Sequence, residues 1–90
     1  MSAAGENWTT ADDDAAIESA LLQQVIALHP TQVTVEELVR ELAGETSGFT
    51  ERDAIERAVR DLSATGLLHH REGFVVPTRA ALRFSELLDR

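Results

Sequence analysis

The chain of 90 residues contains no cysteine, and this absence removes several kinds of chemistry. Without thiols the protein has no disulfide framework, no thiolate zinc site and no cysteine nucleophile. Lysine is absent as well, so that all eight basic residues are arginines. Arginine is the residue that suits recognition of phosphates and bases, although a genome-wide composition bias explains the same usage.

Aromatic residues and long apolar runs are also scarce. Trp8, Phe49, Phe74 and Phe84 are the only aromatic residues, so the core has to be built from leucine, valine, isoleucine and alanine, which suits packed helices. No apolar run approaches the roughly 20 residues that cross a bilayer. The N-terminus is acidic and polar, unlike a secretory leader. We therefore expect a cytoplasmic protein.

Signatures of catalysis and metal binding are missing too. The sequence has no nucleophile elbow, no Walker loop and no dinucleotide-binding glycine pattern, so we predict a protein that is not an enzyme and needs no cofactor. His69 and His70 are adjacent on a predicted strand and therefore point to opposite faces, which prevents them from sharing one metal ion. We expect one of them to pack on the domain and the other to face solvent. The acids of 12–14 lack a glycine bend and indicate an acidic first helical turn instead.

Charge is distributed unevenly along the chain. The formal net charge is −8. Residues 1–49 contain nine carboxylates against the single Arg40, whereas residues 50–90 contain seven of each sign. If part of the protein meets an anionic partner, it is this second part.

The periodicity predicts one domain over 9–90 after a loose tail at 1–8. Thr10 is placed to cap a first helix that ends near Leu28, before Pro30. Apolar residues then recur at helical spacing along one face of this helix. They are Ile17, Leu21, Val25 and Leu28, with Gln24 on the same face. A minimal strand is expected at Gln32 and Val33.

Two capping patterns predict the next two helices. Thr34 and Glu37 form an S/T-x-x-E capping box, and Gly44 ends the second helix. Thr50 and Asp53 repeat the pattern for a third helix that runs to about Thr65. The inner faces are predicted to be Val35, Leu38, Val39 and Leu42 on the second helix, and Ile55, Ala58, Val59 and Leu62 on the third.

The C-terminal part predicts a hairpin and a last helix. Two β-compatible runs, 67–70 and 74–76, flank a three-residue loop, 71–73, in which the glycine supplies a positive φ. Pro77 and Thr78 then end the strand and cap a helix over 79–88. Its inward residues are expected to be Ala80, Ala81, Phe84, Leu87 and Leu88.

The resulting order, α-β-α-α-β-β-α, describes a mainly helical domain with a small β-hairpin. It resembles the winged helix-turn-helix superfamily over about residues 10–88. The resemblance rests on Val33-Thr34-Val35-Glu36-Glu37-Leu38, on Thr50–Leu62, and on Gly66-Leu67-Leu68 followed by His69-His70-Arg71-Glu72-Gly73-Phe74. It implies that the third helix enters the major groove of DNA and that the hairpin, the wing, lies against the backbone or the minor groove. The DNA-binding residues would be Arg52, Arg57, Arg60, His70, Arg71 and Arg79.

Acidic residues on the same helix favour a different interpretation. Asp53 and Glu56 stand among the arginines, and at i,i+4 spacing Asp53 pairs with Arg57 and Glu56 with Arg60. On such a face the acids neutralise the neighbouring arginines. Any acid that stays unpaired repels phosphates.

Apolar residues outside the predicted core indicate an interface. Leu22 and Ile26 lie opposite the inner face of the first helix, and Leu82 lies opposite Phe84 on the last. By resemblance, first and last helices of winged-helix proteins often form the dimer interface. Two hypotheses follow. In the first, the protein is a homodimeric transcriptional regulator that binds double-stranded DNA; in the second, it is an acidic winged-helix module that binds protein.

Overall fold

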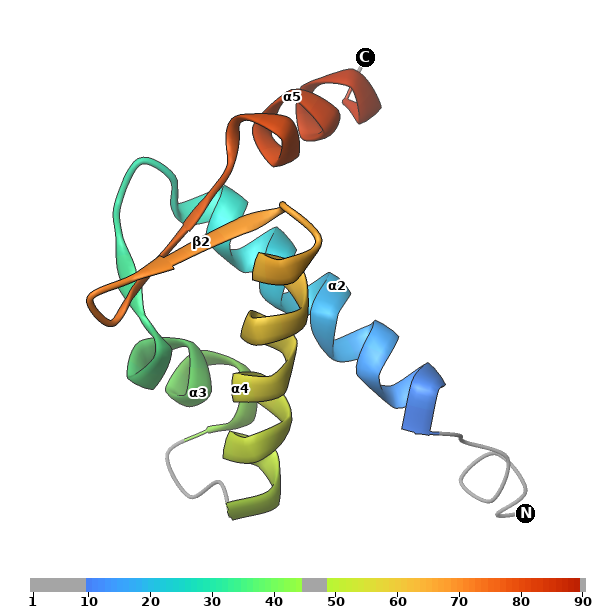
Figure 1. The fold of residues 1–90 in the computed structure, drawn as a ribbon, viewed down its shortest axis with the longest axis vertical. Helices are drawn as coiled ribbons and strands as arrows, with labels where there is room; N and C mark the ends of the chain where they lie inside the picture. Colours follow the sequence, from blue (N-terminus) through green and yellow to red (C-terminus); the bar gives the residue numbers. More distant parts are fainter. Residues whose placement is uncertain (1–9, 45–48, 90) are drawn as a thin grey trace.

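The computed structural model describes residues 10–44 and 49–89, which form helices around a small sheet (Figure 1). The predicted order α-β-α-α-β-β-α is confirmed, and this arrangement is compatible with the winged-helix topology. The predicted tail at 1–8 and the side chains of Thr10 and Thr50 lie outside the described part. The elements are α2 (Thr10–Leu28), β1 (Val33–Thr34), α3 (Val35–Ala43), α4 (Phe49–Ala64), β2 (Leu68–Arg71), β3 (Phe74–Pro77) and α5 (Arg79–Leu88).

The core lies where α2, α3 and α4 meet the sheet. The inner faces predicted for these three helices are confirmed, because their apolar residues are buried or packed against the buried cluster. Leu21, Leu38 and Val59 are among the largest fully buried side chains. Because aromatic side chains are rare, aliphatic contacts supply nearly all of this packing. The buried cluster contains Leu21, Val25, Val33, Leu38, Val39, Ile55, Ala58, Val59, Leu62, Leu68 and Val75.

The start of α3 has the predicted capping box. The Thr34 hydroxyl accepts a hydrogen bond from the Glu37 amide at 3.1 Å, and the Thr34 amide donates one to the Glu37 carboxylate at 2.8 Å. Two amides that the helix leaves without partners are thereby satisfied. Gly44 ends the helix with a φ of 90°, in the region that glycine adopts at no steric cost. The capping box at Thr34 thus starts α3 directly after β1, and Gly44 ends it.

The hairpin differs from the prediction in the length of its turn. Arg71 pairs with Phe74, so that the turn contains two residues, Glu72 and Gly73, and not the predicted three. Both turn residues have positive φ, 55° and 85°, which is the backbone of a type I′ turn. The tighter turn places Arg71 in β2, which lies one residue later than the predicted run 67–70, and β3 continues one residue beyond the predicted 74–76, to Pro77. The strand order is β1-β3-β2, and all pairs are antiparallel.

Helix α5 is capped as predicted but packs differently from the prediction. The Thr78 hydroxyl accepts from the Ala81 amide at 3.2 Å and donates to the Gly66 carbonyl at 2.8 Å. Of the residues expected to point inward, Ala81 alone is buried, and Phe84 remains 60% exposed. Figure 1 shows the reason, since α5 crosses the end of the molecule and only its first turn approaches the core. Ala80, Leu87 and Leu88 are exposed as well.

Candidate interaction surfaces

The outward face of α4 begins with an ion pair between helices. Both guanidinium nitrogens of Arg52 donate to the Glu36 carboxylate on α3, at 2.6 and 2.7 Å. This two-pronged geometry is the strongest that an arginine makes with a carboxylate. The hydrogen bond from Arg52 lowers the pKa of Glu36 and raises that of Arg52. A carboxylate oxygen of Glu56 lies 3.9 Å from the same guanidinium group, so Arg52 interacts with two carboxylates.

Arg57 is held by two carboxylates. It contacts Asp53 at 3.2 Å, which confirms the predicted i,i+4 pair, and it also contacts Asp14 on α2 at 3.2 Å. The hydrogen bond with Asp14 raises the pKa of Arg57. Arg57 therefore links α2 to α4. Because its guanidinium group is already paired with two carboxylates, it is poorly placed to bind a phosphate.

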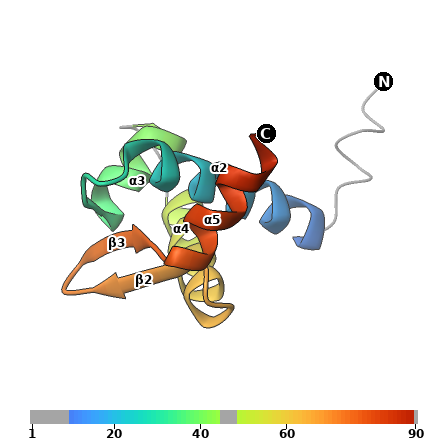
Figure 2. The ribbon, with the colours of Figure 1, turned by 90° about the horizontal axis from the view of Figure 1, so that it is seen from above.

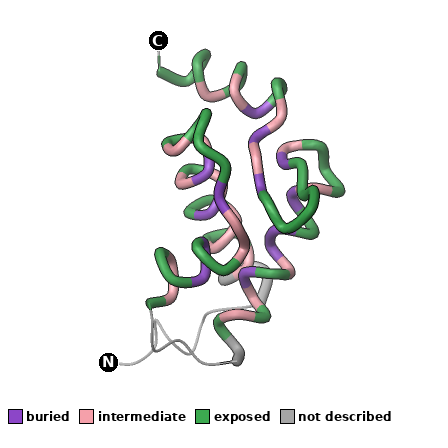
Figure 3. The backbone as a smooth tube through the Cα atoms, turned by 90° about the vertical axis from the view of Figure 1, so that its left-hand side faces the viewer, coloured by how far each residue is buried: buried purple, intermediate pink, exposed green. Residues whose placement is uncertain are grey.

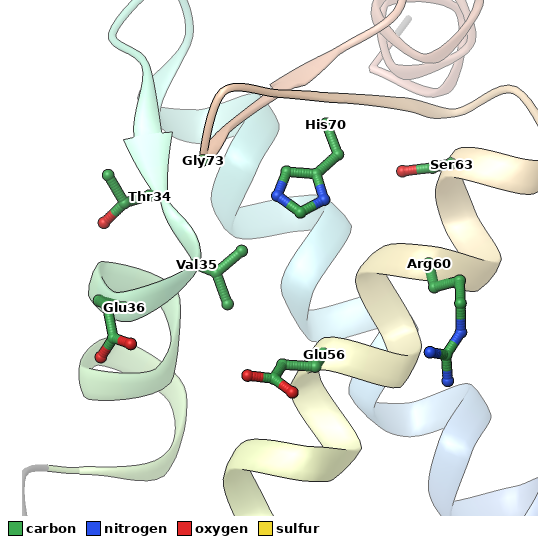
Figure 4. Close-up of a pocket in the computed structure, with 8 residues that line it drawn as sticks. All are labelled: Thr34, Val35, Glu36, Glu56, Arg60, Ser63, His70 and Gly73. Carbon is green, nitrogen blue, oxygen red and sulfur yellow. The ribbon is translucent and has the colours of Figure 1, made fainter.

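The predicted pair between Glu56 and Arg60 is not formed, because Glu56 lies nearer Arg52. Within the described residues, Arg60 has no ion pair. Figure 4 shows its side chain extending along α4, away from His70. His70, Arg71 and Arg79 also have no ion pair with any described residue. The structure thus divides the six predicted DNA-binding residues into two that pair with carboxylates and four that have no carboxylate partner among the described residues.

A hollow of about 770 Å³, here called the α4–wing hollow, lies between the start of α3, the outer side of α4 and the hairpin. His70 points into the space between α3 and α4, and Ser63 points toward His70 (Figure 4). The Ser63 hydroxyl is buried and has no hydrogen-bond partner among the described residues. The hollow contains charges of both signs, because Glu36, Glu56 and Arg60 all line it. Its lining residues are Thr34, Val35, Glu36, Glu56, Arg60, Ser63, His70 and Gly73.

The two histidines occupy opposite faces of the hairpin, as their adjacency predicts. His70 lines the α4–wing hollow, whereas His69 lines a smaller depression beside Gln32 and Phe74. The expectation that one of them packs on the domain is wrong, because both are exposed. No group of three histidine, aspartate or glutamate residues in 10–44 and 49–89 is placed to hold a metal ion.

An apolar groove, here called the α2–α5 groove, separates the middle of α2 from α5 and has a volume of about 470 Å³. Leu22 and Ile26 line it from α2, and Phe84 and Leu88 line it from α5. Leu22 also packs against the core, so it is less separate from the core than predicted. Leu82 is half-buried and lines no part of this groove.

The groove was only half predictable from the sequence. Periodicity identified Leu22 and Ile26 as extra apolar residues on the first helix, but it assigned Phe84 and Leu88 to the core. The assignment to the core is wrong, since Leu88 is 68% exposed. Figure 3 shows the same contrast, with buried stretches along the inner helices and mostly exposed or intermediate residues along α5 at the C-terminal end.

Similarity to known proteins does not assign a function to these surfaces. No protein family, curated protein or solved structure matches the chain significantly. No helix in 10–44 or 49–89 combines the length and the apolar character needed to cross a membrane.

Proposed function

We propose that this protein is an acidic winged-helix module that binds protein through the α2–α5 groove and does not read duplex DNA. The observation that carries the proposal is the neutralisation of Arg52 and Arg57 by Glu36, Asp14 and Asp53. In the winged-helix comparison, α4 is the helix that enters the major groove, and its arginines would have to neutralise phosphates.

The charge of the whole face supports the same conclusion. Helix α3, helix α4 and the hairpin together contain eight carboxylates and five arginines. Each phosphate contact contributes to affinity by releasing counterions, and an unpaired carboxylate near a phosphate opposes it. A DNA-reading face with a net negative charge would therefore bind weakly at any salt concentration.

The α2–α5 groove, in contrast, is lined mainly by apolar side chains. Phe84 and Leu88, which line the groove from α5, are 60% and 68% exposed. Exposed apolar side chains that gather on one face of a small domain are typical of protein interaction sites. Aromatic side chains of this kind contribute strongly to binding when a partner removes them from water. The groove is thus the part of the described surface best suited to a protein partner.

Four residues favour DNA binding as a second candidate function. Arg60 and His70 line one hollow, Arg71 follows His70 in the hairpin, and none of the three has an ion pair with a described residue. Arg79 also has no ion pair within 10–44 and 49–89, although it belongs to α5 and does not line the hollow. These residues define the variants that discriminate the two functions.

The first experiment is an anisotropy titration of a fluorescent duplex of mixed sequence at low ionic strength. We expect no saturation up to about 100 µM protein, the weak end of ordinary non-specific binding. Saturation at lower concentration, weakened by Arg60→Ala and by Arg71→Ala, would overturn the proposal and establish the DNA-binding function.

A second experiment tests the groove with bis-ANS, a dye that becomes fluorescent on exposed apolar surface. We expect native protein to bind the dye and Phe84→Ser to lose most of the signal. Phe74→Ser is a matched control, because Phe74 is 41% exposed but lies on β3 outside the groove. Equal losses in both variants would contradict the assignment of the binding surface.

A further inference from the structure

The α2–α5 groove lies between two helices, and the described residues that line it carry no charge. On α5, the apolar residues lie on one side at 100° per residue and form a stripe, of which Phe84 and Leu88 line the groove. On α2, Leu22 and Ile26 are one turn apart and form the opposite wall. A groove with apolar walls along two helices fits the apolar face of a third helix. The stripe of α5 consists of Ala80, Ala81, Phe84, Leu87 and Leu88.

The charges of α2 are all acidic, and all lie in its N-terminal half. The helix contains four carboxylates before Ser19 and no charged residue from Ser19 to Leu28. Glu18 stands one turn before Leu22, so it continues the α2 wall of the groove toward this acidic half. Figure 2 views the molecule from above and shows the N-terminal part of α2 projecting beyond α5 and the sheet. A helix that lies in the groove and continues along α2 therefore passes from apolar to acidic surroundings.

The acidic charge on this side of the molecule is only partly compensated. Asp14 contacts Arg57 at 3.2 Å, but Glu18 has no ion pair with a described residue. By helical spacing, Arg79 and Arg83 lie on the side of α5 opposite its groove-lining residues. The formal net charge of −8 acts in the same direction at longer range, because it attracts a cationic partner and repels an anionic one.

From the shape and charge of this surface we infer that the groove binds a basic amphipathic helix of another protein. Apolar residues of that helix, at i, i+3, i+4 and i+7, contact Leu22, Ile26 and Phe84, and a basic residue beside them contacts Glu18. Burial of Phe84 supplies most of the affinity, whereas the charges select a basic helix over an acidic one. The inference rests on the proposed function and adds the chemical class of the partner.

Titration of three fluorescent peptides, followed by anisotropy, tests the inference. Each peptide has about 18 residues, which is about five turns of helix. The first has leucines at i, i+3, i+4 and i+7 and lysines elsewhere, and the second has glutamate in place of every lysine. The third has the composition of the first in an order without helical periodicity. We expect the first to bind with a dissociation constant of about 10 to 100 µM, and the other two to bind at least about tenfold more weakly.

Two pairs of variants locate the bound lysine peptide. Phe84→Ser should weaken its binding about tenfold or more, whereas Phe74→Ser, at an exposed phenylalanine outside the groove, should leave it within about twofold of wild type. Glu18→Gln should weaken binding about threefold. Glu41→Gln makes the same change of net charge on α3, outside the groove, and should have a smaller effect. Because both phenylalanines are exposed, their variants should fold, which circular dichroism verifies.

Several results would overturn the inference. A glutamate peptide that binds as tightly as the lysine peptide excludes selection of a basic partner, and an aperiodic peptide that does so reduces the binding to charge alone. Equal effects within either pair of variants exclude binding of the helix in the groove. Absence of binding up to about 1 mM excludes the amphipathic helix as such.

Sedimentation velocity of the protein alone tests the competing occupant. A dimer at the concentrations of the titration that Phe84→Ser dissociates would show that a second copy fills the groove, and would also overturn the inference. The proposed function fails differently, through saturable DNA binding or through equal loss of dye signal in Phe84→Ser and Phe74→Ser. Neither result depends on the peptides.

Discussion

Helices α4 and α5 have similar apolar patterns but different surroundings. On α4, the four residues of the predicted inner face are at most 5% exposed, whereas the stripe on α5 buries Ala81 and leaves Phe84 60% exposed. Helix α4 packs against α2, α3 and β2, whereas α5 lies across one end of the molecule against α2 and β3 (Figure 1). An amphipathic pattern therefore shows which side of a helix is apolar, and the rest of the fold decides whether that side is covered.

The polar sides of the same helices differ in the opposite way. On α4, Arg52 and Arg57 are bound to carboxylates of α3 and α2, so its charges hold the domain together. On α5, the only described ion pair joins Arg83 to Glu86 within the helix. The charges of α4 thus serve the interior of the domain, and those of α5 remain available to a partner.

The largest expected effect separates the two apolar faces. Leu62→Ala should lower the free energy of unfolding by about 3 kcal/mol, because it leaves a cavity in the core. Phe84→Ala, measured at low protein concentration, should change it by less than about 0.5 kcal/mol. Urea denaturation at equilibrium measures both. Similar losses in the two variants would break the contrast between α4 and α5.

A smaller effect concerns the caps of α3 and α5, both of which are threonines. Thr34→Ala should cost about 1 kcal/mol of global stability, since α3 contributes Leu38 and Val39 to the core. Thr78→Ala removes a cap of similar strength, but its effect should be confined to α5, because Ala81 is the buried residue that this helix contributes. Hydrogen exchange of backbone amides distinguishes the two results. Faster exchange in α4 of the Thr78 variant would show that α5 is coupled to the core.

The smallest effect is the dependence of the α3–α4 ion pair on pH. Because the pKa of Glu36 is lowered in the folded state, its contribution is complete above the usual value of 4.5 and is lost as the pH falls through the folded pKa. Thermal unfolding at pH 7 should therefore show a slightly lower Tm for Glu36→Gln than for wild type.

At acidic pH this difference in Tm should disappear, because protonation removes the pair from wild-type protein too. Glu41→Gln is the matched control, since it makes the same change of charge on the same helix and Glu41 has no ion pair with a described residue. A constant difference between Glu36→Gln and wild type from pH 7 to pH 3 would argue against the pair.

Local rules predicted most of the fold. The capping box at Thr34, the glycines at 44 and 66 and the helical spacing depend on neighbours within a few residues, so they can be recognised without the tertiary structure. The turn length was wrong because Glu72 adopts a positive φ, which is uncommon for a residue with a side chain. A sequence rule that assigns positive φ to the glycine alone therefore predicts a longer loop.

The candidate site depended on contacts that the sequence does not show. Asp53 and Arg57 are four residues apart and were predicted to pair, but Glu36 and Arg52 are sixteen apart and meet only because α3 and α4 pack together. Glu56 lies 3.9 Å from Arg52, and Arg60 has no ion pair with a described residue. Long-range ion pairs of this kind change the charge pattern on which a DNA-binding prediction rests.

The position of β2 has one more consequence. It is an outer strand of the described sheet, and its free edge would offer backbone donors and acceptors to a strand of another molecule. His69, His70 and Arg71 occupy most of this strand and are all exposed, so an approaching strand would have to accommodate two imidazoles and a guanidinium group. Polar and charged edges of this kind oppose the growth of sheets from molecule to molecule. The side chains of β2 therefore disfavour pairing of this edge with a strand of another molecule.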